Sequence, residues 1–408
     1  MGELGGRPDL KRQLKSEILQ GFSYERQMSD EEISQAIDDR ILAKNDEGAM
    51  TLGQRLKLQK ELFDSFRRLD ILQELVDDPA ITEIMVNGPD HVFVETKGTI
   101  GRWDKSFESR EQLLDLIQQI VSRVNRIVNT SSPIADARLP DGSRVHVVLE
   151  PVAVNGPILT IRKFPEPMTM KRLLEYGSIS EEAADFLQTL TAARYNMFVS
   201  GGTGAGKTSF LNALSEFIPA DERVITIEDS AELKLSHIKN LVSLETREAN
   251  AEGEGAIGIG NLIRAALRMR PDRVVIGEVR GKEAFDMLQA MNTGHDGSFS
   301  TGHGNSVKDM LLRIETRGMG ATGDLPLSAI RRQIASAVDI MIHVSRMRDK
   351  SRKVVAIEEV DRFENGEILL NPLFRFEETG SESVVEGRLK KVGELKNREK
   401  LRLSGYRL

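Results

Sequence analysis

The stretch MFVSGGTGAGKTSF at residues 197–210 decides the fold of the larger part of the chain. Its first apolar residues predict a strand, its glycine-rich segment a tight loop, and its last residues the start of a helix. Glycines let several backbone N–H groups point at one anion, and the amino-terminal end of a helix adds partial positive charge there. The stretch therefore predicts a loop that binds the phosphates of a nucleotide. The binding residues are expected to be Gly201, Gly202, Thr203, Gly204, Ala205, Gly206, Lys207, Thr208 and Ser209.

Two side chains at the end of this loop are expected to act on the phosphates directly. Lys207 is expected to neutralise charge on the β- and γ-phosphates of ATP, and the Thr208 hydroxyl to bind Mg²⁺. Phe210, Leu214 and Phe217 follow at helical spacing and are expected to seat the helix on a sheet. ATP and Mg²⁺ are thus the predicted cofactors.

Outward from the loop, apolar strands alternate with helical patterns. The predicted strands besides 197–199 are 224–227, 274–276, 298–301 and 340–344. Such alternation favours a mostly parallel sheet covered by helices on both faces, an α/β fold.

Length and composition limit what else the chain contains. Its 408 residues are enough for two or three domains, and it has no cysteine for disulfides or thiolate zinc sites. The net charge of −7 argues against a general nucleic-acid binder. There is no apolar run of about 18 residues and no apolar segment of signal-peptide type near Met1. We expect a cytoplasmic protein that reaches a membrane only through a partner.

Changes in composition and in apolar pattern along the chain predict its domains. Residues 1–65 are highly charged and are expected to form a helical, partly disordered extension, with one helix capped by Ser29. Strand, turn and helix patterns, including a helix that starts after Ser109, predict a smaller α+β domain at 66–164. The remaining predicted segments are a linker at 165–178, the ATPase domain at 179–385 and a solvated, basic tail at 386–408.

Two glutamates are placed by the pattern at the ends of strands. Glu228 follows the strand 224–227, and Glu278 follows 274–276 with Gly277 between, where an Asp would often stand. Carboxyl ends of parallel strands share one edge of a sheet, so both acids are expected beside the phosphate loop. Glu278 is assigned either the activation of water or the organisation of Mg²⁺, and the choice stays open. Acids that merely end strands are the plainer alternative.

Two histidines lie in the segment Thr293–His303. His295 and His303 are candidates for bonding a phosphate oxygen or for sensing the γ-phosphate. Ordinary surface histidines are the alternative, and a metal site is disfavoured because further ligands are lacking. The other four histidines are assigned structural roles: His91, His146, His237 and His343.

Three arginines near the end of the smaller domain are candidates for an arginine finger. Arg138, Arg144 and Arg162 are placed where they would reach the phosphates across a domain or subunit boundary. Surface arginines without such a role remain the alternative. Four further arginines flank the strand before Glu278, and salt bridges are an equal alternative for them: Arg264, Arg268, Arg270 and Arg280.

Four segments in order resemble the ATPases of type II and type IV secretion systems. They are GGTGAGKT at 201–208, ITIEDSAEL at 225–233, LRMRPDRVVIGEVRG at 267–281 and TGHDGS at 293–298. They are similar to that family's Walker A, Asp-box, Walker B and His-box motifs, with Glu228 as the Asp-box acid and Glu278 as the Walker B glutamate. The stretch IADARLPDGSRVH at 134–146 resembles the Tad (CpaF) branch, which assembles Flp-type pili. Many relatives have Leu where this chain has Gly302, a difference that bears on the presentation of His303.

This resemblance implies a homohexamer with a RecA-like carboxyl-terminal domain and a PAS-like amino-terminal domain. It implies catalytic roles for His295 and His303, arginines that approach phosphate, a polytopic inner-membrane platform as partner, and pilin subunits as indirect partners. No direct nucleic-acid partner is expected.

Other functions compete with the pilus motor. A VirB-type ATPase for conjugation or effector secretion is the nearest alternative. A DNA-translocating RecA-like motor is disfavoured by the acidic balance and by aromatic residues at only 5%. A regulator that binds nucleotide without hydrolysis is disfavoured by Glu228 and Glu278.

Overall fold

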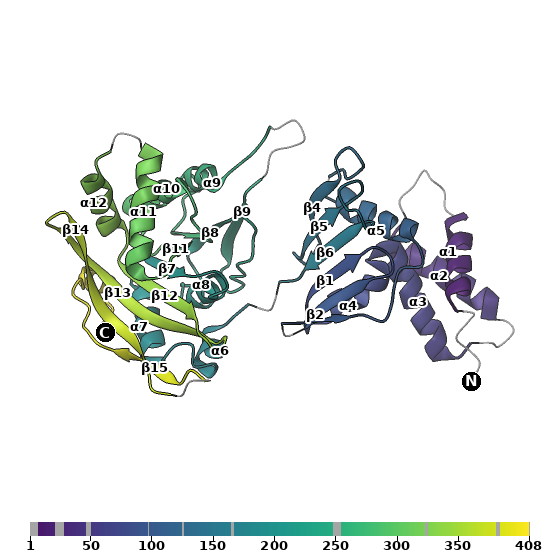
Figure 1. Ribbon diagram of the computed structural model, residues 1–408, viewed down its shortest axis with the longest axis horizontal. Helices are drawn as coiled ribbons and strands as arrows, with labels where there is room; N and C mark the ends of the chain where they lie inside the picture. The colour runs from purple at the N-terminus through teal and green to yellow at the C-terminus, as the bar shows by residue number, and fades with distance from the viewer. Residues whose placement is uncertain are drawn as a thin grey trace. The chain divides into compact units, whose positions relative to one another are not determined.

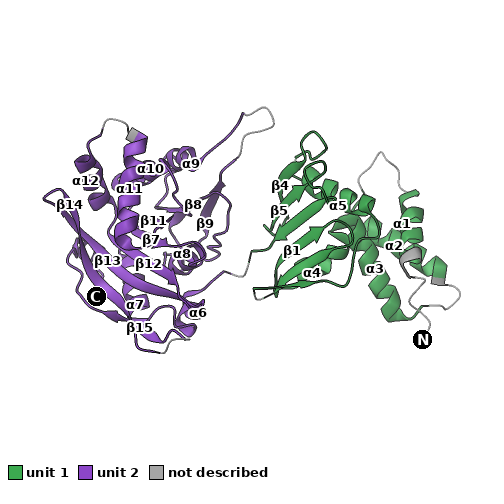
Figure 2. Cartoon of the chain, viewed as in Figure 1, with its two compact units in different colours: residues 1–165 green, residues 166–408 purple. Residues whose placement is uncertain are grey.

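The computed structural model divides the chain into two compact units, residues 1–165 and 166–408 (Figure 2). Each unit has its own sheet and its own buried core. The structure describes residues 7–20, 28–45, 50–96, 98–124, 126–164, 167–247, 254–322, 325–380 and 384–407. Residues 165 and 166 of the predicted linker, and parts of the predicted extension, lie outside these ranges.

Unit 1 begins with three helices that share a small core (Figure 1). Helix α2 starts as predicted after Ser29, because the Ser29 hydroxyl accepts from the Glu32 N–H while the Glu32 carboxylate accepts from the Ser29 N–H. Leu14, Ile37 and Leu62 come from the three different helices and are fully buried. The helices are α1 (Arg7–Gln20), α2 (Asp30–Asn45) and α3 (Leu52–Arg67).

The rest of unit 1 is an antiparallel sheet of six strands in the order β3-β2-β1-β6-β5-β4. Alternation along the strands buries one face, as Val145, Val147, Leu159 and Ile161 show. Helix α5 starts after Ser109 as predicted and packs on that face; it ends at Ser122, and Ile127 beyond it is exposed. The elements are η1 (Asp70–Leu72), α4 (Gln73–Asp77), β1 (Ile81–Asn87), β2 (Val92–Thr96), β3 (Thr99–Arg102), α5 (Arg110–Ser122), β4 (Ile134–Arg138), β5 (Arg144–Val148) and β6 (Ile158–Arg162).

Unit 2 is built on a nine-stranded sheet in the order β15-β14-β13-β12-β7-β11-β10-β8-β9. The strands from β12 to β9 are parallel to their neighbours, whereas β13, β14 and β15 extend the sheet antiparallel. The five strands predicted in this unit are confirmed. The strands are β7 (Met197–Gly201), β8 (Arg223–Glu228), β9 (Asn240–Glu245), β10 (Arg273–Ile276), β11 (Phe299–His303), β12 (Ile340–Arg346), β13 (Arg352–Glu364), β14 (Glu367–Glu378) and β15 (Gly387–Lys391).

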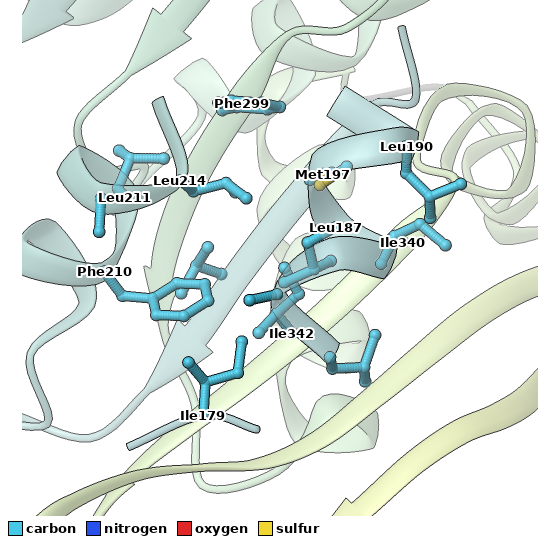
Figure 3. Close-up of a cluster of buried hydrophobic side chains, with 14 of the residues drawn as sticks. Ile179, Leu187, Leu190, Met197, Phe210, Leu211, Leu214, Phe299, Ile340 and Ile342 are labelled. Atoms are coloured by element: carbon cyan, nitrogen blue, oxygen red, sulfur yellow. The ribbon is translucent and has the colours of Figure 1, made fainter. Parts of the chain in front are cut away.

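Helices cover both faces of this sheet, as predicted. Successive residues of β7 enter opposite cores: Met197 and Val199 face the helices α6, α7 and α8, and Phe198 faces α9 to α12. Figure 3 shows the first core, where Phe210, Leu211 and Leu214 lie near Ile342. The helices are α6 (Met170–Glu175), α7 (Glu181–Ala192), α8 (Lys207–Ser215), α9 (Ile259–Ala266), α10 (Glu283–Asn292), α11 (Val307–Thr322), α12 (Leu327–Ala337) and α13 (Glu399–Ser404).

Residues 386–407 belong to the core of unit 2, which corrects the prediction of a solvated tail. Strand β15 pairs with β14, and Leu389, Leu395 and Leu401 are buried. Lys400 forms ion pairs with Asp296 and Asp339 at 2.6 and 2.7 Å. The many basic residues around these three buried leucines led to the wrong prediction. The predicted linker is also partly structured, because Met170 of α6 is buried in the same core.

Within the described ranges of the chain, no helix is long and apolar enough to cross a membrane.

Candidate functional site

The phosphate loop lies between β7 and α8, at the carboxyl end of the parallel strands. Gly204 and Gly206 have φ angles of +71° and +91°, in the left-handed region that favours glycine. Gly206 is the residue directly before α8, so the loop ends on a helix amino-terminus. The sequence therefore produces the strand, loop and helix that an anion-binding site of this type needs.

Lys207, His303 and Glu278 meet beside this loop. The Lys207 ammonium lies 3.2 Å from His303 Nδ1, and His303 Nε2 lies 2.8 Å from Glu278 Oε1. Burial lowers the pKa of Lys207, and burial together with the Lys207 charge lowers the pKa of His303. A neutral His303 therefore accepts from Lys207 and turns its other nitrogen towards the carboxylate.

Arg280 holds one oxygen of Glu278, whereas the other oxygen faces His303 without a well-aligned hydrogen bond. Arg280 donates to Glu278 Oε2 at 2.9 Å and also lies 3.5 Å from Asp229. Glu278 Oε1 is buried and accepts no well-aligned hydrogen bond within the described part of the chain. A buried carboxylate oxygen without a donor is costly unless a ligand or water uses it. This oxygen is thus the acceptor that the site offers to an incoming group.

Glu228 lies at the end of β8 and is almost fully buried, 3% exposed. Its carboxylate accepts from the backbone N–H groups of Glu232 and Leu233 at 3.0 and 3.2 Å. Burial nevertheless raises its pKa to about 7, against the effect of these two bonds. Glu228 therefore carries a proton for part of the time near neutral pH.

Close packing explains the two glycines at which the chain departs from the usual pattern. A Cβ at Gly277 would lie 2.8 Å from Glu228 Cγ, so the Glu228 side chain fills the space that an Asp would occupy. A Cβ at Gly302 would lie 2.8 Å from Met310 Cε and 2.9 Å from Phe198 Cζ. Gly302 thus fits a crowded strand, and His303 still projects next to Lys207.

The structure does not bring His295 to this cluster. His295 precedes β11, at the strand's amino-terminal edge, and its Nδ1 lies 3.3 Å from the Ala290 carbonyl oxygen. The neighbouring Asp296 pairs with Lys400, and Gly297 donates to Asn196, which precedes β7. His295 and His303 therefore stand at opposite ends of β11, so the structure brings only His303 to the phosphate loop of its own subunit, and the catalytic role implied for His295 stays a prediction.

Arg138, Arg144 and Arg162 form one row across three neighbouring strands of unit 1. Arg144 of β5 is the cross-strand partner of both Arg138 of β4 and Arg162 of β6. Cross-strand partners share a face, which here is the one opposite to the buried Val145 and Ile161. The Arg144 guanidinium also lies 5.5 Å from the centre of the Phe164 ring. The three arginines are thus brought together on unit 1, while the phosphate loop belongs to unit 2.

Sequence patterns missed a group of residues on β12 and β13. His343, assigned a structural role, lies 2.9 Å from the Ser200 hydroxyl directly before the loop. Arg352 donates to the Gly204 carbonyl at 3.0 Å, and Arg346 is its register partner on β12. No local motif marks these arginines, because their place depends on how two strands pair.

The residues present fit Mg²⁺ beside a bound nucleotide. Thr208 follows Lys207 in the first turn of α8, and the buried Glu278 Oε1 accepts no well-aligned bond within the described residues. No cluster of three or more His, Cys, Asp or Glu side chains suited to a metal occurs among the described residues. Thr208 would hold the ion directly and Glu278 through water, with phosphate oxygens completing its shell.

A family model described as type II/IV secretion system protein matches residues 67–391. The chain belongs to this family. The match includes the whole unit 1 sheet and nearly all of unit 2, and thus all four motifs of the carboxyl-terminal domain. The family assignment by resemblance is confirmed, and with it the expectation of an ATPase in general terms. The Tad branch is a finer distinction that this match does not make.

Curated relatives include proteins named for conjugal transfer and for type IV secretion. A putative conjugal transfer protein of Mycobacterium tuberculosis is 37% identical over 294 residues, which span 70% of this chain and 83% of the relative. The type IV secretion system protein VirB11 of Brucella suis is 33% identical over 307 residues, 68% of this chain and 84% of the relative.

A solved structure supports the fold. The pilus retraction motor PilT with bound ADP aligns with a TM-score of 0.53 and 20% identity, over 73% of this chain and 83% of that one. At this identity the likeness shows the α/β fold alone.

Proposed function

We propose that the chain is a homohexameric motor that hydrolyses ATP to drive pilus assembly or retraction and secretion through an inner-membrane platform. The observation that carries the proposal is the contact chain from Lys207 through His303 to Glu278 at the edge of the phosphate loop. It joins a phosphate-binding cation to a carboxylate oxygen that accepts no well-aligned hydrogen bond within the described residues. Charge stabilisation and water activation are the two requirements of γ-phosphoryl transfer.

Each residue has a distinct role in the proposed reaction. The loop N–H groups and Lys207 bind the phosphates, and Glu278 accepts a proton from the attacking water. The water oxygen forms a bond to the γ-phosphorus, and the bond from that phosphorus to the bridging oxygen of ADP breaks. Mg²⁺, when bound, supplies neutralisation of phosphate charge. His303 contacts both Lys207 and Glu278 and is placed to report the presence of the γ-phosphate.

The arginine row of unit 1 is proposed to complete the site in the hexamer. Arg138, Arg144 and Arg162 concentrate positive charge on one sheet face, and phosphoryl transfer is accelerated when an arginine neutralises the transition state. Arg144→Ala is therefore expected to lower turnover more than nucleotide affinity, with Arg110→Ala on the surface of the same unit as the control. Equal loss of turnover and affinity would reassign Arg144 to simple binding.

The Tad pilus role is our more specific proposal, and it rests on the resemblance of residues 134–146, which include strands β4 and β5. The relatives named for conjugal transfer and type IV secretion favour a second candidate, a VirB-type ATPase. Deletion of the gene in its native host separates the two. Loss of surface pili, restored by the wild-type gene but not by Lys207→Ala, supports the pilus motor. Intact pili with loss of conjugation or effector export support the second candidate.

The purified chain tests the motor proposal itself. We expect Mg²⁺-dependent ATP hydrolysis by a particle of six copies, measured by phosphate release and by light scattering after size exclusion. Lys207→Ala is expected to lower hydrolysis at least a hundredfold, whereas Lys308→Ala on the exposed side of α11 leaves it unchanged. A chain that binds ATP without hydrolysing it in any oligomeric state would contradict the proposal.

A further inference from the structure

The turn that joins β12 to β13 carries two arginines on the side of the phosphate loop. Arg346 and Arg352 are partners in the strand register, and the Met347 N–H donates to the Ser351 carbonyl at 2.8 Å within the turn. Val344 and Val354, two residues away from each arginine, belong to the same core as the side chains of α8. Because side chains alternate along a strand, both arginines face the side of the sheet where α8 lies.

Arg352 touches the phosphate loop at two glycines. Its Nε donates to the Gly204 carbonyl at 3.0 Å. Its Cδ lies 3.0 Å from the position that a Cβ at Gly206 would occupy, so the side chain packs across that glycine. The Arg346 guanidinium is 4.0 Å from the corresponding position at Gly204. Side chains from β12 and β13 thus pack against the phosphate loop.

Arg346 and Arg352 have no acidic partner among the residues that the structure describes. Both are exposed, and neither forms an ion pair within the described part of the chain. Arg348, in the same turn, does pair with Glu378 and so differs from its two neighbours. Two uncompensated positive charges beside an anion-binding loop raise the local potential for a polyphosphate.

We propose that Arg352 is a positioning residue for the phosphate loop and that Arg346 adds to the attraction for the phosphate chain. The inference deepens the proposed ATPase function and rests on it. The hydrogen bond from Arg352 holds the Gly204 carbonyl oxygen on the outer side of the loop. The negative end of that peptide dipole then stays away from bound phosphates, and the loop can present N–H groups to them.

This role predicts an effect on phosphate binding rather than on the chemical step. Arg352 touches loop backbone and no reacting atom, so its loss is expected to change KM more than kcat. The effect is expected to be the same for ADP and for inorganic tripolyphosphate, because it does not depend on the adenine base.

The experiment compares Arg352→Met, Arg352→Lys and Arg348→Met in the full-length chain. Calorimetry with ADP and with inorganic tripolyphosphate measures affinity, and phosphate release measures KM and kcat. Arg352→Met keeps the aliphatic packing across Gly206 but loses the donor, and it is expected to weaken both ligands and raise KM about tenfold, with kcat within about twofold. Arg352→Lys keeps a charged donor and is expected within about threefold of wild type. Arg348→Met is expected to match wild type.

Two results would overturn the inference. One is Arg352→Met with wild-type affinity for both ligands. The other is a fall in the melting temperature without nucleotide that accompanies the loss of affinity in both Arg352 variants, which would make Arg352 a packing residue only. A wild-type chain that binds neither ADP nor tripolyphosphate would instead contradict the proposed ATPase function itself.

Discussion

The parallel strands of unit 2 carry buried charged side chains at their amino-terminal ends and at their carboxyl ends, here called the amino-terminal edge and the carboxyl edge of the sheet. The two edges differ in how completely these side chains are paired. At the amino-terminal edge, Arg273 is fully buried, forms a bidentate pair with Glu222 and donates to the carbonyls of Thr191 and Gly297. At the carboxyl edge, Glu278 has a buried oxygen without a well-aligned donor among the described residues. The charged groups at the amino-terminal edge find their partners within the chain, whereas the Glu278 carboxylate can still accept a hydrogen bond from a ligand.

Three side chains at the carboxyl edge have shifted pKa values. Burial raises the pKa of Glu228 and lowers those of Lys207 and His303, so three charged forms are disfavoured around one loop. Perturbed groups that gather around one loop are frequent at functional sites, although structural pairs are shifted too: burial raises the pKa of Asp339, which pairs with Lys400 at the amino-terminal edge. Buried charged side chains occur at both edges and therefore do not identify the candidate active site. A buried charged group that lacks a well-aligned partner does identify it.

The largest effect on stability is expected at the amino-terminal edge. Arg273→Met leaves the buried Glu222 carboxylate with Arg194 as its one remaining charged partner among the described residues, and it is expected to lower the free energy of unfolding by about 3 kcal/mol. Denaturant unfolding measures this, with Arg402→Met, an exposed arginine, as the control expected to change it by less than about 0.5 kcal/mol. A loss of less than about 1 kcal/mol for Arg273→Met would break the comparison.

The carboxyl edge is expected to make stability depend on pH. The folded chain holds the Glu228 proton up to about pH 7, whereas the unfolded chain releases it near 4.5. The folded state therefore binds more protons in this window, and its stability from this group falls as the pH rises from 4.5 to 7. Glu228→Gln is expected to remove on the order of 1–3 kcal/mol of that fall.

Denaturant unfolding at pH 5 and pH 8 checks this expectation. Glu399→Gln changes an exposed carboxylate and serves as the control, with the pH dependence of wild type. An identical pH dependence in Glu228→Gln and wild type would show that Glu228 is ionised throughout.

The two histidines test the comparison on activity. His303→Ala removes a side chain that contacts both Lys207 and Glu278, and turnover is expected to fall about tenfold. His295 lies at the amino-terminal edge, and His295→Ala is expected to change turnover by less than about twofold. Steady-state ATP hydrolysis by the two variants measures this difference. A larger loss of turnover in His295→Ala than in His303→Ala would contradict the assignment of catalysis to the carboxyl edge.

Local patterns were sufficient for the parts of the fold that depend on nearby residues. The strand, loop and helix from Met197 to Ser215 follow from glycine spacing and apolar periodicity, and the helix after Ser29 follows from its capping residues. The placement of Glu228 and Glu278 at one edge followed from the rule that parallel strands end on the same side.

Contacts between distant segments were beyond such patterns. The spacing of His295 and His303 gives no sign that β11 runs between them, and at about 3.3 Å per residue a five-residue strand separates its ends by roughly 13–17 Å. The burial of Leu389 and Leu401 was hidden by the surrounding lysines and arginines. Arg352 reaches Gly204 only through the pairing of β13 with β12, which the sequence does not specify locally.

The most direct test of the account is ATP hydrolysis and ATP binding by Glu278→Gln. This change keeps the size of the side chain and removes the carboxylate that accepts the proton of the attacking water. The account predicts that the variant binds ATP with an affinity within about threefold of wild type and loses hydrolysis at least a hundredfold. Wild-type turnover in Glu278→Gln would contradict the central claim that this edge of the sheet is the catalytic one.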